Sequence, residues 1–186
     1  LYQGANGKNS EEKVDQVLSE FGEEDILLLQ NEINLLGSMI DKAYEKHMKI
    51  VLNPSPLNET LLKCDLKKVS LFILNEVEGE QLTGETEPEK ILEKLEILYP
   101  ASEAVLTLGR QGSIYAGKGK RYRGRSFSVP AVDTTAAGDT YTGYFLASVL
   151  QGKSIEESIK TASAASAIAV TRKGAVPSIP ERKEVE

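Results

Sequence analysis

Short, almost wholly apolar runs recur along the chain, and segments with helical spacing separate them. The runs are DILLLQ at 25–30, KIVLN at 49–53, VSLFIL at 69–74 and AVLTL at 104–108. Strands without a polar face are buried on both sides, and helical connections provide that cover. We therefore expect an α/β fold with a mostly parallel central sheet, helices on both faces and right-handed crossovers.

Helical patterns fill the intervals between these strands. They are predicted at 11–21, from a cap at Asn34 to His47, and at 76–82, 88–98, 139–150 and 154–170. Between 112 and 129, glycines separate short alternating segments, which predicts an antiparallel hairpin at a sheet edge. We expect residues 1–186 to form a single α/β domain.

Composition narrows the classes of function. The 186 residues carry a net charge of -6, which disfavours general affinity for nucleic acid or anionic membranes, so neither is expected as a partner. The single cysteine, Cys64, cannot form an internal disulfide, and no apolar run has the length of a membrane span or resembles a targeting segment. A cytoplasmic location is therefore expected. The lone histidine, His47, leaves too few ligands for a histidine-rich zinc site.

The strongest local motif is DTTAAGD at 133–139, placed between an extended segment at 127–132 and a helix. Small residues allow the backbone to approach a ligand, and the amides at a helix start stabilise negative charge. Phosphate is the expected ligand. Asp139 would then reach a substrate hydroxyl beside the phosphate, although spacing alone equally allows it to be only a helix cap.

This motif resembles the D-T-x-G-A-G-D signature of the ribokinase-like (PfkB) carbohydrate kinases, with Ala136 at the first glycine, as in the ribokinase branch. NEVEGEQLTG at 75–84 resembles the family's N-E-x-E element, and TLGRQG at 107–112 resembles its nucleotide turn. AIAVTRKGA at 167–175 resembles the C-terminal stretch of ribokinases. The motifs follow the family's order, which implies a ribokinase-like three-layer fold.

The resemblance implies that the chain corresponds to the C-terminal two-thirds of a ribokinase. Family members are about half as long again, and the chain begins at a point about a third of the way along them. The first strands of the sheet, the lid and most of the sugar site would then be missing. A homodimer is possible for a full-length parent, but its lid contact would be absent here.

The resemblance also implies an ATP-dependent transfer of phosphate to a sugar hydroxyl, with D-ribose giving ribose 5-phosphate. Asp139 would be the general base and would contact the substrate, and Glu32 matches a sugar-contacting glutamate. The anion hole would consist of the amides of Ala136, Ala137, Gly138 and Asp139. Alternatively, Glu32 is an exposed acidic residue in a loop.

Nucleotide and cation ligands follow from the same resemblance. Asn75 and Glu78 would act near the triphosphate and its Mg²⁺ through waters, whereas without the family context they are an ordinary helix start. The remaining positions implied for ATP are Thr107, Gly109, Gly112 and, near the adenine, Ser163. A monovalent cation, K⁺, would contact Asp133, Thr135, Ala169, Arg172, Gly174 and Ser178, mostly through carbonyl oxygens.

Two alternatives stay open. Another sugar or nucleoside kinase of the same family is possible, although Ala136 and the stretch 170–174 favour ribokinase. A non-catalytic nucleotide-binding or oligomerising module that retains the fold without turnover is the alternative from a different class. Competing motifs fail: GKS at 152–154 lacks the first glycine of a P-loop, where Ala147 stands.

Overall fold

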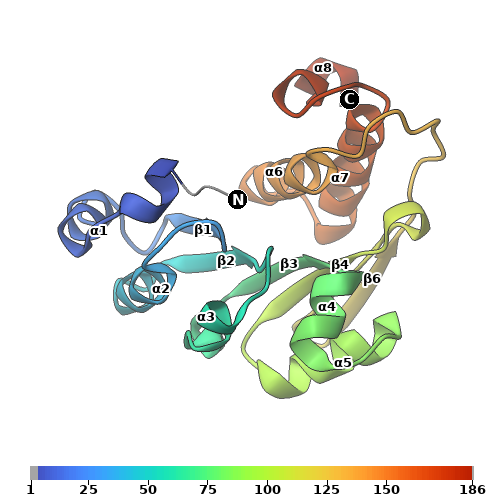
Figure 1. Ribbon diagram of the computed structural model, residues 1–186. Coiled ribbons are helices and arrows are strands. Elements are labelled where there is room, and N and C mark those ends of the chain that lie inside the picture. Colours follow the sequence, from blue (N-terminus) through green and yellow to red (C-terminus); the bar gives the residue numbers. More distant parts are fainter. Residues whose placement is uncertain (1–3, 186) are drawn as a thin grey trace. The chain divides into compact units, whose positions relative to one another are not determined.

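The computed structural model describes residues 4–185, and six strands form one sheet in the order β1-β2-β3-β4-β5-β6 (Figure 1). Strands β1, β2 and β3 are parallel, with Leu28 opposite Val51 and Leu52 opposite Phe72. This architecture confirms the predicted α/β fold class. The strands are β1 (Ile26–Gln30), β2 (Lys49–Asn53), β3 (Leu71–Asn75), β4 (Glu103–Thr107), β5 (Ser113–Gly117) and β6 (Lys120–Gly124).

The predicted edge hairpin is present as β5 and β6. Lys118 and Gly119 alone connect these strands, and both have positive φ, 52° and 70°. A two-residue connection with two positive φ angles is the hairpin turn that matches the twist of antiparallel strands. The segment 127–132, for which an extended conformation is predicted, contains no strand.

The chain divides into two compact units. The first unit comprises residues up to Leu106 together with 116–119, and the second comprises 107–115 together with the residues from Lys120 onward. The single-domain organisation stays a prediction.

In the first unit, helices lie along one face of the strands (Figure 1). Ile50, Leu52, Leu74 and Ile91 are almost wholly buried in its core. At Gly79 an added Cβ would lie 2.8 Å from Ile91 Cγ2, so the two helices that carry these residues approach closely. The helices of this unit are α1 (Glu11–Leu18), α2 (Leu36–Glu45), α3 (Glu59–Leu62), α4 (Glu76–Thr83) and α5 (Pro88–Leu98), with short 3₁₀ turns η1 (Gly4–Lys8) and η2 (Leu66–Lys68).

Asn34 is not the cap of α2, so that prediction is wrong. Leu35 occupies the N-cap position with a φ of 63°, and no side chain caps the helix. The Asn34 side chain instead accepts from the Asn9 amide at 3.0 Å and donates to the Asn9 carbonyl at 2.8 Å. Because the Asn34 side chain is engaged by Asn9, it is not used to cap the helix. Asn9 lies 25 residues away, so no local sequence pattern reveals it.

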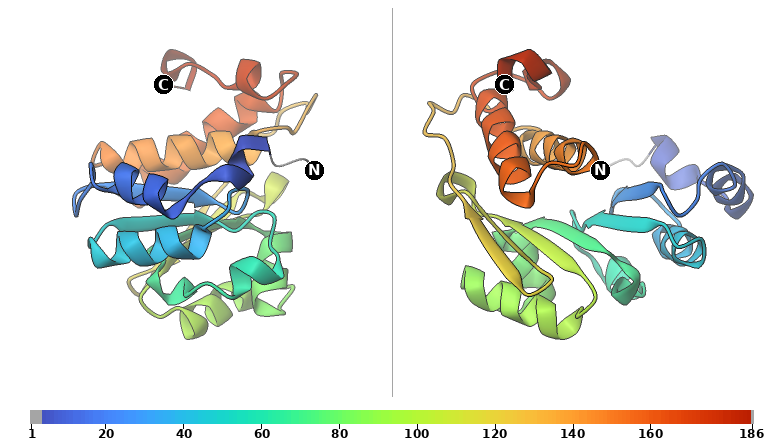
Figure 2. Two further views of the ribbon diagram at one scale, coloured as in Figure 1. Left: turned by 60° about the vertical axis from the view of Figure 1, so that its left-hand side comes forward. Right: turned by 180° about the vertical axis from the view of Figure 1, so that it is seen from behind.

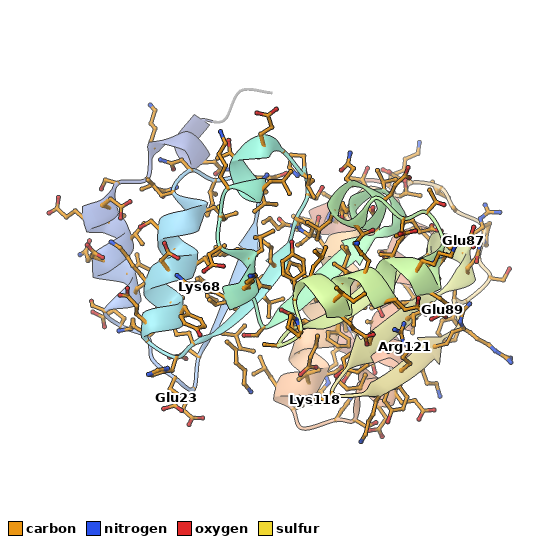
Figure 3. All side chains as sticks on the ribbon, turned by 90° about the horizontal axis from the view of Figure 1, so that it is seen from below. Glu23, Lys68, Glu87, Glu89, Lys118 and Arg121 are labelled. Carbon is orange, nitrogen blue, oxygen red and sulfur yellow. The ribbon has the colours of Figure 1, made fainter. Side chains whose placement is uncertain are left out.

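Charged side chains join the outer elements of the first unit. Lys68 lies beside α2 (Figure 3), where its Nζ is 2.6 Å from Asp41 Oδ1 and 5.5 Å from the centre of the Tyr44 ring. The pKa of Lys68 is raised, chiefly by the hydrogen bond to Asp41. Exposed pairs of this kind contribute little to stability, so the core and not these charges holds the unit together.

The second unit is built on the helical hairpin of α6 (Ala137–Leu150) and α7 (Ile155–Ala169) (Figure 2). Phe145 and Ile159 are almost wholly buried in it. Strand β6 packs on α7 so closely that a Cβ on Gly124 would lie 2.1 Å from Ile159 Cγ2. The unit also contains the 3₁₀ turns η3 (Gly109–Gln111) and η4 (Val176–Ser178) and the short helix α8 (Arg182–Val185). No helix within residues 4–185 is long and apolar enough to cross a membrane.

Candidate active site

The DTTAAGD motif forms the turn at which α6 begins. Ala136 occupies the N-cap position in the left-handed region, with a φ of 59° and no side-chain cap. The first intrahelical bond runs from the Thr140 amide to the Ala136 carbonyl at 2.9 Å, so the Gly138 amide precedes the helical ladder. The Ala137 amide donates to the Thr134 carbonyl at 3.2 Å. Of the predicted anion-hole amides, that of Ala137 therefore already has an acceptor inside the turn.

Asp133 anchors this turn to a distant part of the second unit. Its Oδ1 accepts from the amide and the hydroxyl of Thr135, at 2.9 and 2.7 Å, and its Oδ2 accepts from the Gly174 amide at 2.9 Å. The Thr135 hydroxyl and these amides lower the pKa of the Asp133 carboxyl to about 2. The charged carboxylate thus holds the turn against the segment that follows α7.

Beside the turn lies a pocket of about 420 Å³, within the range usual for small-molecule sites. It brings together predicted residues from three separated motifs: Thr107, Gly109, Gly112, Ala137, Gly138 and Ser163. All described lining residues belong to the second unit. Ala136 and Asp139 do not line it, and Asp139 is exposed on the first turn of α6.

Gly112 shapes the pocket wall through its backbone. Its φ is 93°, and an added Cβ would lie 2.0 Å from the Gly124 carbonyl oxygen. The Gly112 carbonyl accepts from the Leu108 amide at 2.8 Å, which closes the turn between β4 and β5. Only glycine fits this position, because the two backbones approach too closely to leave room for a Cβ and because φ is positive.

Hydroxyl groups line and support another wall. Ser113 Oγ lies 2.7 Å from Tyr141 Oη, and Tyr141 and Ser163 both line the pocket. Burial raises the pKa of Tyr141 to about 12, so its hydroxyl is neutral and able to donate. The Tyr141 ring stacks on Phe145, with centroids 6.4 Å apart.

Sequence reasoning missed several lining residues. The segment 126–131 has no secondary structure and no motif, so nothing in the sequence marks it as a wall. Tyr141 and Ser166 lie on helices already predicted, and helical spacing from Gly138 and Ser163 was the available signal. The missed lining residues include Arg110, Phe127, Ser128, Tyr141, Ser166 and Val170.

Asn75 and Glu78 form a capping box at the start of α4 in the first unit. The Asn75 side chain accepts from the Glu78 amide at 2.9 Å, and the Glu78 carboxylate accepts from the Asn75 amide at 2.9 Å and from Asn75 Nδ2 at 3.1 Å. The structure therefore gives these side chains the ordinary helix-start role. Glu32, also in the first unit, is exposed in the turn after β1.

The six residues predicted for a monovalent cation lie in the turn before α6, at the last residue of α7 and in the segment that follows α7. The Arg172 guanidinium pairs with Glu184 at 2.5 Å, and because a guanidinium is cationic and has no acceptor atom, only the Arg172 carbonyl is a candidate ligand. The Ala169 carbonyl accepts from the Arg172 amide at 3.0 Å, and the Ser178 hydroxyl donates to the Ala175 carbonyl at 2.7 Å. Residues 4–185 contain no group of three or more histidine, cysteine, aspartate or glutamate side chains suited to a metal ion.

The chain is similar to carbohydrate kinases over nearly its whole length. Residues 1–182 match the model of the pfkB family carbohydrate kinases. The ribokinase of Haemophilus influenzae is 38% identical over 99% of the chain, and the chain covers 62% of that relative. Crystal structures of ribokinase from Thermotoga maritima (33% identity, TM-score 0.79) and from Arabidopsis thaliana complexed with ribose and ATP (30%, 0.82) each match 99% of the chain and 62% of their own length. The chain thus spans about three-fifths of the relatives it matches, and it belongs to the pfkB family of carbohydrate kinases.

Proposed function

We propose that the protein transfers the γ-phosphate of ATP to a sugar hydroxyl, with D-ribose as acceptor and ribose 5-phosphate as product. The observation that carries the proposal is the pocket that joins the nucleotide turn at 107–112 to the amide turn at the start of α6. The Arabidopsis thaliana relative complexed with ribose and ATP supports the choice of both substrates. Cytoplasmic location and dimerisation of a full-length parent stay predictions.

In this proposal the start of α6 stabilises the migrating phosphoryl group. The Gly138 amide and the helix dipole favour the charge that develops on its oxygens. The Asp139 carboxylate takes the proton of the sugar hydroxyl as that oxygen bonds to the γ-phosphorus and the bond to ADP breaks. Asp139 is suited to this role by its place on the first turn, next to the amides that hold the phosphate.

Asn75 and Glu78 would serve the Mg²⁺ of Mg-ATP through water molecules. Because each side chain is already held by the other, neither needs to reorganise when the metal and its waters arrive. Mg²⁺ retains several of its waters when it binds, which suits side chains that contact the ion through water molecules. The ion would neutralise charge on the triphosphate.

The donor set for a monovalent cation fits a large, weakly hydrated ion. Oxygen is the only donor type it offers, and the Asp133 carboxylate ties the turn at 133–135 to Gly174, so the two contributing segments are held together. The carbonyls of Asp133, Thr135, Ala169, Arg172 and Gly174, with the Ser178 hydroxyl, would hold the ion. K⁺ there would supply positive charge near the anion-binding turn.

A non-catalytic nucleotide-binding module is the second candidate function. Two observations favour it: the Ala137 amide is already bonded within its turn, and Asp139 does not line the pocket. Another sugar or nucleoside kinase of the family is the remaining alternative, and replacing ribose by other sugars and nucleosides in the assay distinguishes it.

Titration with Mg-ATP, with and without K⁺, followed by coupled measurement of ADP release with ribose, tests the proposal. We expect saturable nucleotide binding that K⁺ strengthens. We expect this binding to be weak and turnover of the chain alone to be near background, because the lid and most of the sugar site would be missing. In an active full-length parent, Asp139→Asn should leave the Kd for Mg-ATP within about twofold and lower turnover by about 10²- to 10⁴-fold, the usual contribution of a general base. Absence of saturable binding contradicts every kinase reading, and turnover that survives Asp139→Asn contradicts the assignment of the base.

A further inference from the structure

Arginines are concentrated in β6 and at the start of the irregular segment that follows it. Arg121, Arg123 and Arg125 alternate along the chain and are all exposed, although the protein as a whole carries a net charge of -6. None of the three is among the described lining residues of the pocket, so the proposed function does not use them. An exposed basic stretch of this kind is complementary to an acidic groove on another protein.

Three serines of the second unit each stand three residues after an arginine. The pairs are Arg110 with Ser113, Arg123 with Ser126 and Arg125 with Ser128. Arginine at this spacing is what a serine kinase with an acidic substrate groove recognises, because a carboxylate binds a guanidinium in a bidentate manner. Sequence spacing thus gives three candidate acceptors, and only the structure distinguishes them.

The structure leaves Ser128 as the accessible candidate. Ser113 is 0% exposed in β5, and its Oγ lies 2.7 Å from Tyr141 Oη. Ser126 is half-buried, and its hydroxyl donates to the Arg110 carbonyl. Ser128 is exposed and lies in irregular backbone between β6 and α6, so no strand or helix has to open before this segment enters the groove of another enzyme.

A phosphate on Ser128 would lie at the wall of the pocket. Ser128 lines the pocket together with Arg110 and with Gly138 at the start of α6. Phosphoserine carries a charge of about -1.5 to -2 and three strong acceptor oxygens. It would therefore repel the triphosphate of a nucleotide and would compete with it for the donors of the same pocket.

We infer that Ser128 is a phosphorylation site for a serine kinase directed to basic substrates, and that the phosphate opposes nucleotide binding. In the modification step, Ser128 Oγ bonds to the γ-phosphorus of an ATP held by that kinase, the bond to ADP breaks, and the hydroxyl proton passes to the base of the kinase. The effect on nucleotide binding rests on the proposed function, which places a nucleotide in this pocket, whereas the modification itself does not.

The modification is tested by incubating the protein with Mg-ATP and a serine kinase that selects arginine three and five residues before the serine. Mass spectrometry of the peptides should find one phosphate, on Ser128. Ser128→Ala should abolish incorporation, and Arg125→Lys should slow it by about threefold or more, because an ammonium lacks the bidentate geometry of a guanidinium. Ser113 is the matched internal control, because it follows an arginine at the same spacing but is buried, and it should stay unmodified.

Calorimetric titration with Mg-ATP measures the consequence for the pocket. The phosphorylated protein should have a Kd about tenfold or more above that of the unmodified protein, because the added charge opposes the triphosphate. Ser128→Glu should have a Kd about threefold above that of Ser128→Gln, which has nearly the same size without the charge. Both differences should shrink as the ionic strength rises.

The possible failures are distinguishable. Absence of phosphate on Ser128, or incorporation at Ser113 or Ser126 in its place, overturns the inference at the modification step. An unchanged Kd for Mg-ATP in the phosphorylated protein, or equal Kd values for Ser128→Glu and Ser128→Gln, overturns the effect on nucleotide binding. Failure of the unmodified protein to bind Mg-ATP overturns the proposed function instead, and phosphate on Ser128 would still be detected.

Discussion

The start of α4 in the first unit and the start of α6 in the second unit each carry a motif predicted to bind part of the nucleotide, and hydrogen bonds hold the two motifs in different ways. At α4, Asn75 and Glu78 satisfy each other across three residues. At α6, Asp133 reaches Gly174, 41 residues away, and Ser166 reaches the Ala137 carbonyl, 29 residues away. The first motif is held by hydrogen bonds between neighbouring residues, whereas the second is held only when segments that are far apart in the sequence come together.

The largest loss of stability is expected from a substitution at Gly112, where two backbone segments that are separated in sequence come together. Gly112→Ala should lower the free energy of unfolding by about 3–5 kcal/mol, because the new Cβ would overlap the Gly124 carbonyl and φ is positive. Urea denaturation measures the change. The matched control is Gly119→Ala, which has a φ of 70° but no atom within 4 Å of its Cβ, and which should cost only about 1 kcal/mol. Equal losses in the two variants would contradict the role of the backbone contact.

Within residues 4–185, helices α4 and α7 both begin with a capping box, and an effect of intermediate size is expected from removing either one. Asn75→Ala at α4 and Ser154→Ala at α7 should each lower the free energy of unfolding by about 1 kcal/mol, since each removes a helix cap. If Asn75 also serves Mg-ATP, only Asn75→Ala should raise the KM for Mg-ATP. Kinetics and denaturation of both variants test this, and an unchanged KM in Asn75→Ala would leave the box purely structural.

Sequence reasoning succeeded where the cause is local and failed where it is not. The strands follow from apolar runs, and the hairpin of β5 and β6 follows from its glycines, because these patterns act over a few residues. The cap at Asn34 was wrong because Asn9, 25 residues away, takes its side chain. The pair of Ser113 and Tyr141 gave no signal, since its members lie 28 residues apart on two elements that only the fold brings together.

Within the site as well, residues in recognisable motifs were predicted and residues outside such motifs were missed. The nucleotide turn and the amide turn were predicted from the family resemblance, and the structure places residues of both around one pocket. The wall at 126–131 was missed because irregular backbone has no periodicity to detect. The sequence predicted an ordinary helix start at Asn75 and Glu78 as the alternative to a nucleotide site, and the structure adds the capping box, a pattern contained within four residues.

The smallest expected effect concerns acid stability of the turn before α6. The Asp133 carboxyl has a pKa of about 2 in the folded chain, against 3.8 ordinarily, so its contribution to stability is present above pH 3.8 and disappears as the pH falls through about 2. Asp133→Asn removes the charge, and its amide nitrogen cannot accept from the Gly174 amide. We expect the melting temperature of the unmodified protein to exceed that of Asp133→Asn above pH 4, and the difference to shrink toward pH 2.

Thr135→Val distinguishes the contribution of the local hydrogen bond between Asp133 and Thr135 from that of the remote hydrogen bond between Asp133 and Gly174. It removes the hydroxyl that lowers the Asp133 pKa most, but retains the Thr135 backbone amide and the bond to Gly174. The carboxyl should then titrate at a higher pH, and the loss of stability should begin earlier in an acid titration followed by circular dichroism. If instead the difference between the unmodified protein and Asp133→Asn persists unchanged to pH 2, the carboxylate is not what joins the turn to Gly174. The remote contact would then depend on the backbone bonds from Val132 and Asp133 to the Val170 carbonyl, at 2.7 and 3.2 Å.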